Sequence, residues 1–208
     1  MIQIRDTFQV KFGKIDQAVE HWKAFREQIM ADLRPDARME LLTDLSGMMY
    51  TLIAARHLES LAHWEQARTA TFAHPKFHDW YKPFQQLVED GSRDFFNMEQ
   101  GNEGWSGPGA VVIRSCFRAL EWRIQETVEL LQSYGAMLVD CGVATRPRIL
   151  TDASGRMFNV VIEAETHDLK TWDTHRKTMF RDAQFQVWFR RLLTCVSHGS
   201  HEFYAVVG

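Results

Sequence analysis

Two arginines lie within apolar helical patterns, where a guanidinium could bind an anionic ligand. Each pattern places apolar residues three or four positions apart on one helix face, and the second pattern repeats the first: Leu61, Trp64, Arg68 and Phe72, then Leu169, Trp172, Arg176 and Phe180. A buried unpaired charge is costly, so we expect Arg68 and Arg176 to be buried and paired. The partner is a carboxylate, a set of carbonyls or a bound anion.

Two interpretations of these arginines stay open. The structural one, which we favour because the pattern recurs, is an ion pair or carbonyl clamp within each arginine's own half of the chain. In the other, Arg68 and Arg176 bind the carboxylate or phenolate of a ligand. Trp64 and Trp172 would then form aromatic walls, although aromatic residues at helical spacing are more often core.

His175 is the strongest candidate for chemistry. It stands where the first pattern has Ala67, beside Trp172 and Arg176. A lone histidine is usually structural, but imidazole titrates near neutral pH and coordinates iron, so His175 could act as a general base or a haem ligand. Because a catalytic site needs only one competent copy, this asymmetry points to a ligand site in the second half of the chain.

Other catalytic and metal-binding patterns find no support. His74 and His78 are four residues apart, but Pro75 favours a helix start after His74, and no third ligand is suggested. The sequence has no Ser-His-Asp order, phosphate-binding glycine loop or HExxH motif. We therefore expect no metal, nucleotide or other cofactor, with haem left open as an alternative.

The chain contains an internal repeat. Residues 42–96 align without gaps on residues 150–204, and residues 8–20 align on 117–129 once a one-residue gap is placed near residues 30–38. Residues 99–109, EQGNEGWSGPG, are rich in glycine and lack periodicity, as is typical of a linker. We predict two domains, residues 1–98 and 110–208, called the first half and the second half below.

Each half has the pattern of a ferredoxin-like unit. In the first half, alternation predicts a strand over 2–10, and apolar spacing predicts a helix over 15–29. Strands over 38–43 and 48–56 flank a turn at Asp44-Leu45-Ser46-Gly47. Helices over 60–73 and 75–89 and a strand over 93–98 complete a β-α-β-β-α-β order with one extra helix. The fold class is α+β.

The third strand predicts how the halves associate. Residues 49–55 are almost all apolar, so both faces of this strand must be buried, whereas helices cover only one face of such a sheet. We therefore predict that the two sheets pack face to face in an intramolecular α/β barrel. Arg5 and Arg114 would point into its interior. We favour pairing with Glu40, Glu163 or Glu202 there; the alternative is an electropositive, ligand-binding interior that includes Arg114.

Several short motifs together resemble the NIPSNAP family of the dimeric α/β barrel superfamily, which also contains antibiotic-biosynthesis-type monooxygenases. These motifs are Ile4-Arg5 followed by Phe8, Gly13-Lys14, Arg68, His74-Pro75 and Trp80-Tyr81. The resemblance implies the barrel fold, and it implies an activity less firmly, because the superfamily includes cofactor-free oxygenases, haem enzymes and proteins without known chemistry. The second half departs from the motifs with Glu121-Trp122-Arg123 and Asp182-Ala183.

Composition limits the partners. The 208 residues carry 24 basic and 27 acidic side chains, intermixed, which argues against nucleic acid and anionic membranes. No apolar run approaches a membrane span, no signal peptide is evident, and three widely spaced cysteines fit reduced thiols, so we expect a cytoplasmic protein. The expected partner is a small aromatic or anionic molecule bound between helices and sheet; self-association stays open. The alternatives are a cofactor-free or haem-dependent monooxygenase and a non-catalytic structural or interaction module.

Overall fold

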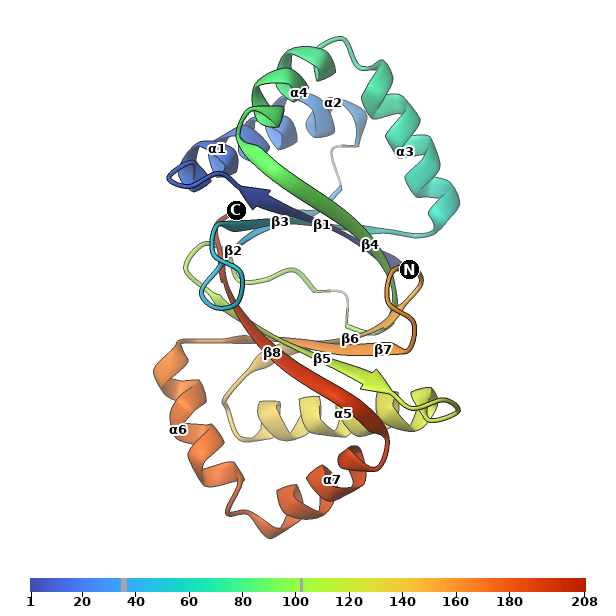
Figure 1. Cartoon of the computed structure of the whole chain (residues 1–208), viewed down its shortest axis with the longest axis vertical. Coiled ribbons are helices and arrows are strands. Elements are labelled where there is room, and N and C mark those ends of the chain that lie inside the picture. The colour runs from blue at the N-terminus through green and yellow to red at the C-terminus, as the bar shows by residue number, and fades with distance from the viewer. Residues whose placement is uncertain (35–36, 102) are drawn as a thin grey trace.

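The eight strands close into one antiparallel barrel in the computed structural model, which describes residues 1–34, 37–101 and 103–208. The strand order is β1-β3-β2-β8-β5-β7-β6-β4, and the helices lie outside the barrel in two groups (Figure 1). No helix in these ranges is both long and apolar enough to cross a membrane.

The two halves have the same order of strands and main helices. The first half contains β1 (Ile2–Val10), α1 (Ile15–Phe25), the π-helix η1 (Arg26–Met30), α2 (Ala31–Leu33), β2 (Met39–Asp44), β3 (Thr51–Leu58), α3 (Leu61–Ala73), α4 (Phe77–Gln85) and β4 (Val88–Gln100). The second half contains β5 (Val111–Ala119), α5 (Ile124–Asp140), β6 (Thr145–Asp152), β7 (Asn159–Thr166), α6 (Leu169–Met179), α7 (Ala183–Leu193) and β8 (Val196–Val206).

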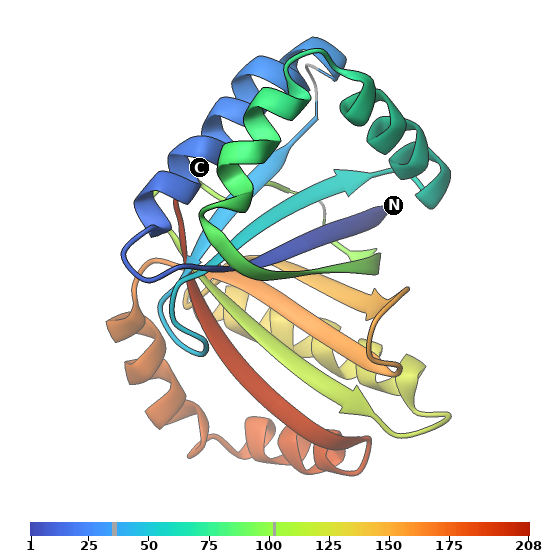
Figure 2. The same cartoon turned by 45° about the horizontal axis from the view of Figure 1, so that its top comes forward.

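The barrel is closed within the single chain, as the sequence predicted. Each half contributes four neighbouring strands, β4-β1-β3-β2 and β8-β5-β7-β6, and the β2–β8 and β4–β6 pairs join them. Figure 2 shows each group of helices on the outer side of its own four strands. Strand β4 is longer than the predicted 93–98 because it pairs with β1 along its first part and with β6 along its last.

Strand β3 is buried on both faces, which confirms the prediction from its continuous apolar run. Leu52 and Ala54 pack in the core beneath the helices of the first half. Ile53 and Ala55 lie in the barrel interior. Successive residues of a strand point to opposite faces, so the same strand supplies both cores.

The π-helix η1 lies next to the gap in the repeat. The sequence alignment places one extra residue in the first half near residues 30–38; just before this stretch α1 continues into η1, whereas α5 is an uninterrupted α-helix. A π turn holds one more residue than an α turn, and such turns often occur at functional sites. Met30, the last residue of η1, borders the cavity described below.

The segment predicted as a linker enters the barrel. Trp105 is 9% exposed and belongs to the interior cluster that contains Ile53 and Tyr204. The centroid of its ring lies 3.6 Å from the guanidinium carbon of Arg148. Residue 102 of the predicted linker lies outside the described residues.

Candidate functional site

The barrel interior holds a buried network of charged side chains centred on Glu163 of β7. Arg114 of β5 donates to Glu163, as do Arg5 Nη1 at 3.4 Å and Gln3 Nε2 at 3.2 Å, both from β1. Burial alone would raise the pKa of Glu163, but Arg114, Arg5 and the nearby Arg148 outweigh it and lower this pKa from 4.5 to about 2. The predicted pairing of Arg5 and Arg114 with an interior carboxylate is confirmed.

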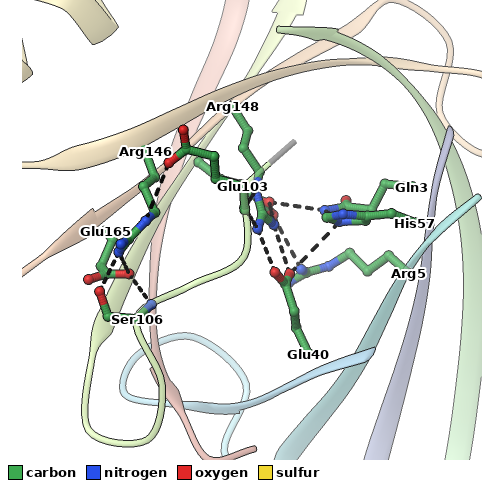
Figure 3. A network of polar contacts seen from close by, with 10 residues as sticks. Gln3, Arg5, Glu40, His57, Glu103, Ser106, Arg146, Arg148 and Glu165 are labelled. Atoms are coloured by element: carbon green, nitrogen blue, oxygen red, sulfur yellow. Dashed lines mark hydrogen bonds and ion pairs between the residues drawn. The ribbon is translucent and has the colours of Figure 1, made fainter. Parts of the chain in front are cut away.

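A second pair joins the two halves. Arg148 of β6 is fully buried, and its Nη1 donates to Glu40 Oε2 of β2 at 2.7 Å (Figure 3). His57 Nε2 of β3 lies 3.9 Å from the same oxygen. Glu40 therefore pairs with Arg148, while Glu202, the third suggested partner, accepts a hydrogen bond from Tyr204. Arg148 is not among the interior residues predicted from the sequence, although a charged residue directly before Ile149 and Leu150 was a usable signal.

The prediction that Arg68 and Arg176 are buried is wrong, since both lie on exposed parts of their helices. Arg68 Cζ lies 4.8 Å from the ring centroid of Phe72, and Arg176 Nη2 lies 3.4 Å from Asp173. Helix α3 has no buried residue at all. Its apolar face borders a cavity instead of packing closely on the sheet, so the arginine in that face stays accessible.

Two adjoining cavities separate α3 from the sheet of the first half. The outer cavity, about 320 Å³, lies between α3, the end of β3 and the segment that contains η1 and α2. The aromatic cavity, about 240 Å³, lies between α3, α4, α1 and the sheet. Its walls are mainly aromatic and include Trp22, Phe25, Trp64, Phe72, Phe77 and Trp80. Arg56 and Thr71 line both cavities and so form the boundary between them.

An ionic triad from three strands lies at the sheet side of the aromatic cavity, where its two arginines, Arg56 and Arg93, form part of the lining. Asp6 of β1 is 1% exposed and accepts from Arg56 Nη2 of β3 at 2.8 Å and from Arg93 Nε of β4. Burial lowers the pKa of Arg56, against the opposing effect of Asp6. Arg56 Nε is buried without a hydrogen-bond partner among the described residues. A ligand oxygen could satisfy this donor, because buried polar groups are normally hydrogen-bonded.

Helix α3 also carries an imidazole to the outer cavity. Ser60 caps the helix by accepting from the backbone N–H of His63 at 3.2 Å, which fixes the first turn of α3. His63 lines the outer cavity, and its Nδ1 lies 3.1 Å from Glu59 Oε2. His57 lines the same cavity, and burial lowers its pKa, partly opposed by Glu40. The imidazole of His57 contacts Gln3 and Glu40 in the barrel interior, so His63 is the imidazole positioned to contact a bound molecule.

The corresponding positions of the second half carry different side chains. In the sequence repeat, Ser115, Ala164 and His201 replace the triad residues of the first half. Ser115 Oγ and His201 Nδ1 are hydrogen-bonded at 2.7 Å. Met179 takes the place of Thr71 and is buried in the core of the second half. The larger apolar side chain fills space at the position where the first half has Thr71.

The residues predicted to form the ligand site in the second half do not border either cavity. Trp172 is buried in a hydrophobic core, and His175 lies partly exposed on α6, where burial lowers its pKa. Arg114 lies in the barrel interior with Glu163. Of the predicted site residues, Trp64 and Arg68 line the aromatic cavity.

Metal-binding side chains do not gather in the described part of the chain, where no three His, Cys, Asp or Glu residues form a group that could hold an ion. His74 Nε2 lies 3.4 Å from Asp32 Oδ2 of α2. His78 packs edge-on against Phe77. The two histidines that are four residues apart in sequence therefore have separate contacts.

Comparison with known proteins supports the fold. No family model and no curated protein matches the sequence. A candidate monooxygenase of Fusobacterium nucleatum aligns with 100% of this chain and 92% of its own, at 10% identity and a TM-score of 0.72. A heme-degrading enzyme of Listeria monocytogenes aligns with 99% of both chains, at 10% identity and a TM-score of 0.55.

A NIPSNAP domain protein of Burkholderia xenovorans aligns with 46% of this chain and 91% of its own, at 18% identity and a TM-score of 0.39. The solved structures similar to this chain thus include a candidate monooxygenase along its full length and NIPSNAP proteins along about half of it, the two groups that the sequence resemblance named. The full-length similarities, at these low identities, establish the barrel fold.

Proposed function

We propose that the first half binds a small aromatic anion in the cavities between α3 and the sheet. The observation that carries this proposal is the buried Arg56 Nε, a donor without a partner at a position that lines both cavities. An aromatic ring would occupy the aromatic cavity. An oxygen atom next to the ring, from a carboxylate, phenolate or carbonyl group, would accept a hydrogen bond from Arg56 Nε.

The charge around the cavities supports an anionic ligand. Their lining includes five arginines and, among the described residues, no carboxylate: Arg34, Arg38, Arg56, Arg68 and Arg93. Asp6, beneath the cavity, neutralises part of this charge through Arg56 and Arg93. The guanidinium of Arg93 lies 5.6 Å from the ring centroid of Trp64, which leaves a surface of aromatic faces and cations.

Replacing Arg56 tests the proposal. We expect Arg56→Met to weaken 2-naphthoate binding at least tenfold, because a hydrogen bond to a charged group contributes about 1.5 to 3 kcal/mol. Isothermal titration calorimetry measures the dissociation constants. The neutral analogue 2-naphthalenemethanol should lose much less affinity. Arg176→Met, an exposed arginine of the second half, is the matched control and should bind 2-naphthoate like the unmodified protein; equal affinity in all three proteins would contradict the proposal.

The proposed site belongs to one copy of a duplicated unit. We take residues 1–98 and 110–208 as tandem ferredoxin-like domains joined by residues 99–109. The matching order of strands and main helices, and the matching order of strands within each half of the barrel, support this division. Only the first copy would then bind the ligand, because the triad residues and Thr71 are replaced in the second.

Cofactor-free oxygenation is a second candidate function. It is favoured by the imidazole of His63 at the outer cavity and by the similarity to a candidate monooxygenase. His63 would take a proton from an acidic CH₂ group of an aromatic substrate. The carbanion would reduce O₂, so that one oxygen atom becomes a carbonyl and the other leaves as water. The haem alternative would depend on His175, which borders neither cavity, and the proposal does not include it.

Oxygen consumption tests this second function. With anthrone as substrate, we expect uptake of O₂ above the rate without protein. His63→Phe should slow that uptake at least tenfold, since proton transfer by a positioned side chain typically contributes about 100-fold or more. An oxygen electrode follows the rate. His175→Phe is the control in the second half; slowing by His175→Phe and not by His63→Phe would place the chemistry in the second half instead.

A further inference from the structure

We infer that the ligand is an elongated aromatic acid that occupies both cavities at once. This inference rests on the proposed function and adds the class of ligand to it. The ligand would carry an aromatic ring, a carbonyl or similar oxygen acceptor next to the ring, and a carboxylate at the end of a flexible chain. The ring would lie in the aromatic cavity and the chain in the outer cavity.

The boundary between the cavities supports a continuous site. Arg56 on the sheet and Thr71 on α3 line both cavities, so a molecule that passes from one to the other must pass these two side chains. The free Nε of Arg56 would bind the acceptor at this boundary. Each cavity alone, at about 320 and 240 Å³, is at or below the lower end of the range for ligand sites, roughly 300 to 1,000 Å³.

The outer cavity has the chemistry that a chain ending in an anion requires. Its apolar lining includes Met30, Leu58 and Ala67, which suit methylene groups. Arg34 and Arg38 lie at its exposed side and suit a terminal carboxylate. The two cavities therefore differ in kind: one is aromatic, and the other is aliphatic with a cationic border.

The comparison between the halves points to the same channel. Ala67 and Thr71 of α3 are replaced by His175 and Met179 in α6, which are larger. In the first half, η1 also places Met30 at the outer cavity, whereas α5 of the second half contains no π-helix. The open channel thus depends on features of the first half that the second half lacks.

A ligand series tests the inference. The probes are ω-benzoylalkanoates with two, four and six methylenes between ketone and carboxylate, and calorimetry measures their affinities. We expect affinity to rise by up to about fourfold per added methylene, the gain typical of burying one CH₂ group. The ω-phenylalkanoates of equal length lack the ketone. They should bind the unmodified protein more weakly than the ketone probes do. In Arg56→Met, the two series should bind with equal affinity.

Variants at the boundary and at the far end locate the chain. Thr71→Met, the residue found in the second half, should remove the dependence on chain length, because the larger side chain closes the boundary between the cavities. Arg34→Met combined with Arg38→Met should weaken only the longest probe, while Arg176→Met should change nothing. Thermal unfolding of each variant confirms that it is folded.

The outcomes separate the inference from the proposed function. If 2-naphthoate binds but affinity does not change with chain length in the unmodified protein, the elongated ligand is excluded and the aromatic site remains. If the length dependence persists in Thr71→Met, the chain does not pass between Thr71 and Arg56, and the inference is again wrong. If neither 2-naphthoate nor any member of the series binds, the proposed function fails and the inference fails with it.

Discussion

Glu163→Gln should lower the free energy of unfolding by about 3 to 5 kcal/mol, the cost of removing one partner from a buried ion pair. Glu163 is 1% exposed and is the acceptor for Arg5 and Arg114, both buried in the barrel interior. Glutamine keeps the size of the side chain and removes its charge. Two buried guanidiniums would then face each other without their carboxylate.

The dependence of stability on pH provides an independent measurement. The pKa of Glu163 is lowered to about 2 in the folded protein, so its ionised form stabilises the fold at neutral pH. This stabilisation is complete above the unfolded-state pKa near 4.5 and is lost as pH falls from there towards 2. Urea unfolding at pH 7 and pH 3 measures how much the free energy of unfolding falls between the two pH values. This decrease should be smaller in Glu163→Gln than in the unmodified protein.

A surface carboxylate serves as the control for Glu163. Glu126 of α5 pairs with Arg123 and Arg191 at the exposed surface, and Glu126→Gln should change stability little because exposed ion pairs are screened by solvent. If Glu163→Gln were as stable as Glu126→Gln at neutral pH, Glu163 could not be the carboxylate that stabilises the buried Arg5 and Arg114. The proposed organisation of the barrel interior would then be incorrect.

Asp6→Asn should have opposite effects on stability and on ligand affinity. The substitution leaves Arg56 and Arg93 without their shared carboxylate and should lower the free energy of unfolding by about 2 to 3 kcal/mol, less than a fully buried pair because Arg93 is 40% exposed. The same loss frees both guanidiniums to bind an anion. We therefore expect 2-naphthoate to bind about tenfold more tightly.

Unfolding experiments with and without ligand measure both effects of Asp6→Asn. Saturating 2-naphthoate should raise the melting temperature of Asp6→Asn more than that of the unmodified protein, since tighter binding to the folded state stabilises it more. Ser115→Ala, at the corresponding position of the second half, is the control and should leave ligand affinity unchanged. Weaker binding by Asp6→Asn would show that Asp6 is needed to orient Arg56, and that freeing the two guanidiniums does not strengthen anion binding.

The sequence by itself determined the barrel and the pairing in its interior. Alternation along a strand fixes which residues share a face. The apolar run of β3 therefore required two buried faces, and the polar faces of β1 and β5 placed Arg5 and Arg114 inside the barrel. The internal repeat supplied the second sheet from the same chain. Each of these inferences needs only local periodicity and the cost of exposing apolar surface or burying an unpaired charge.

Helix periodicity, in contrast, could not place the site. It shows which face of α3 points inward but not how far the helix stands from the sheet, and that distance leaves Arg68 exposed at a cavity. From the sequence, His175 is predicted to be a functional addition to the second half. The structure shows instead that the shorter Ala67 lines a cavity in the first half.

Only the tertiary structure could reveal the groups that surround the proposed ligand. Asp6, Arg56 and Arg93 are far apart in sequence and meet because β1 pairs with both β3 and β4. Arg148 and Glu40 come from different halves and meet only when the barrel closes. The sequence contains these charges, but strand register and barrel closure decide which carboxylate each arginine reaches, and therefore which donor on Arg56 is left for a ligand.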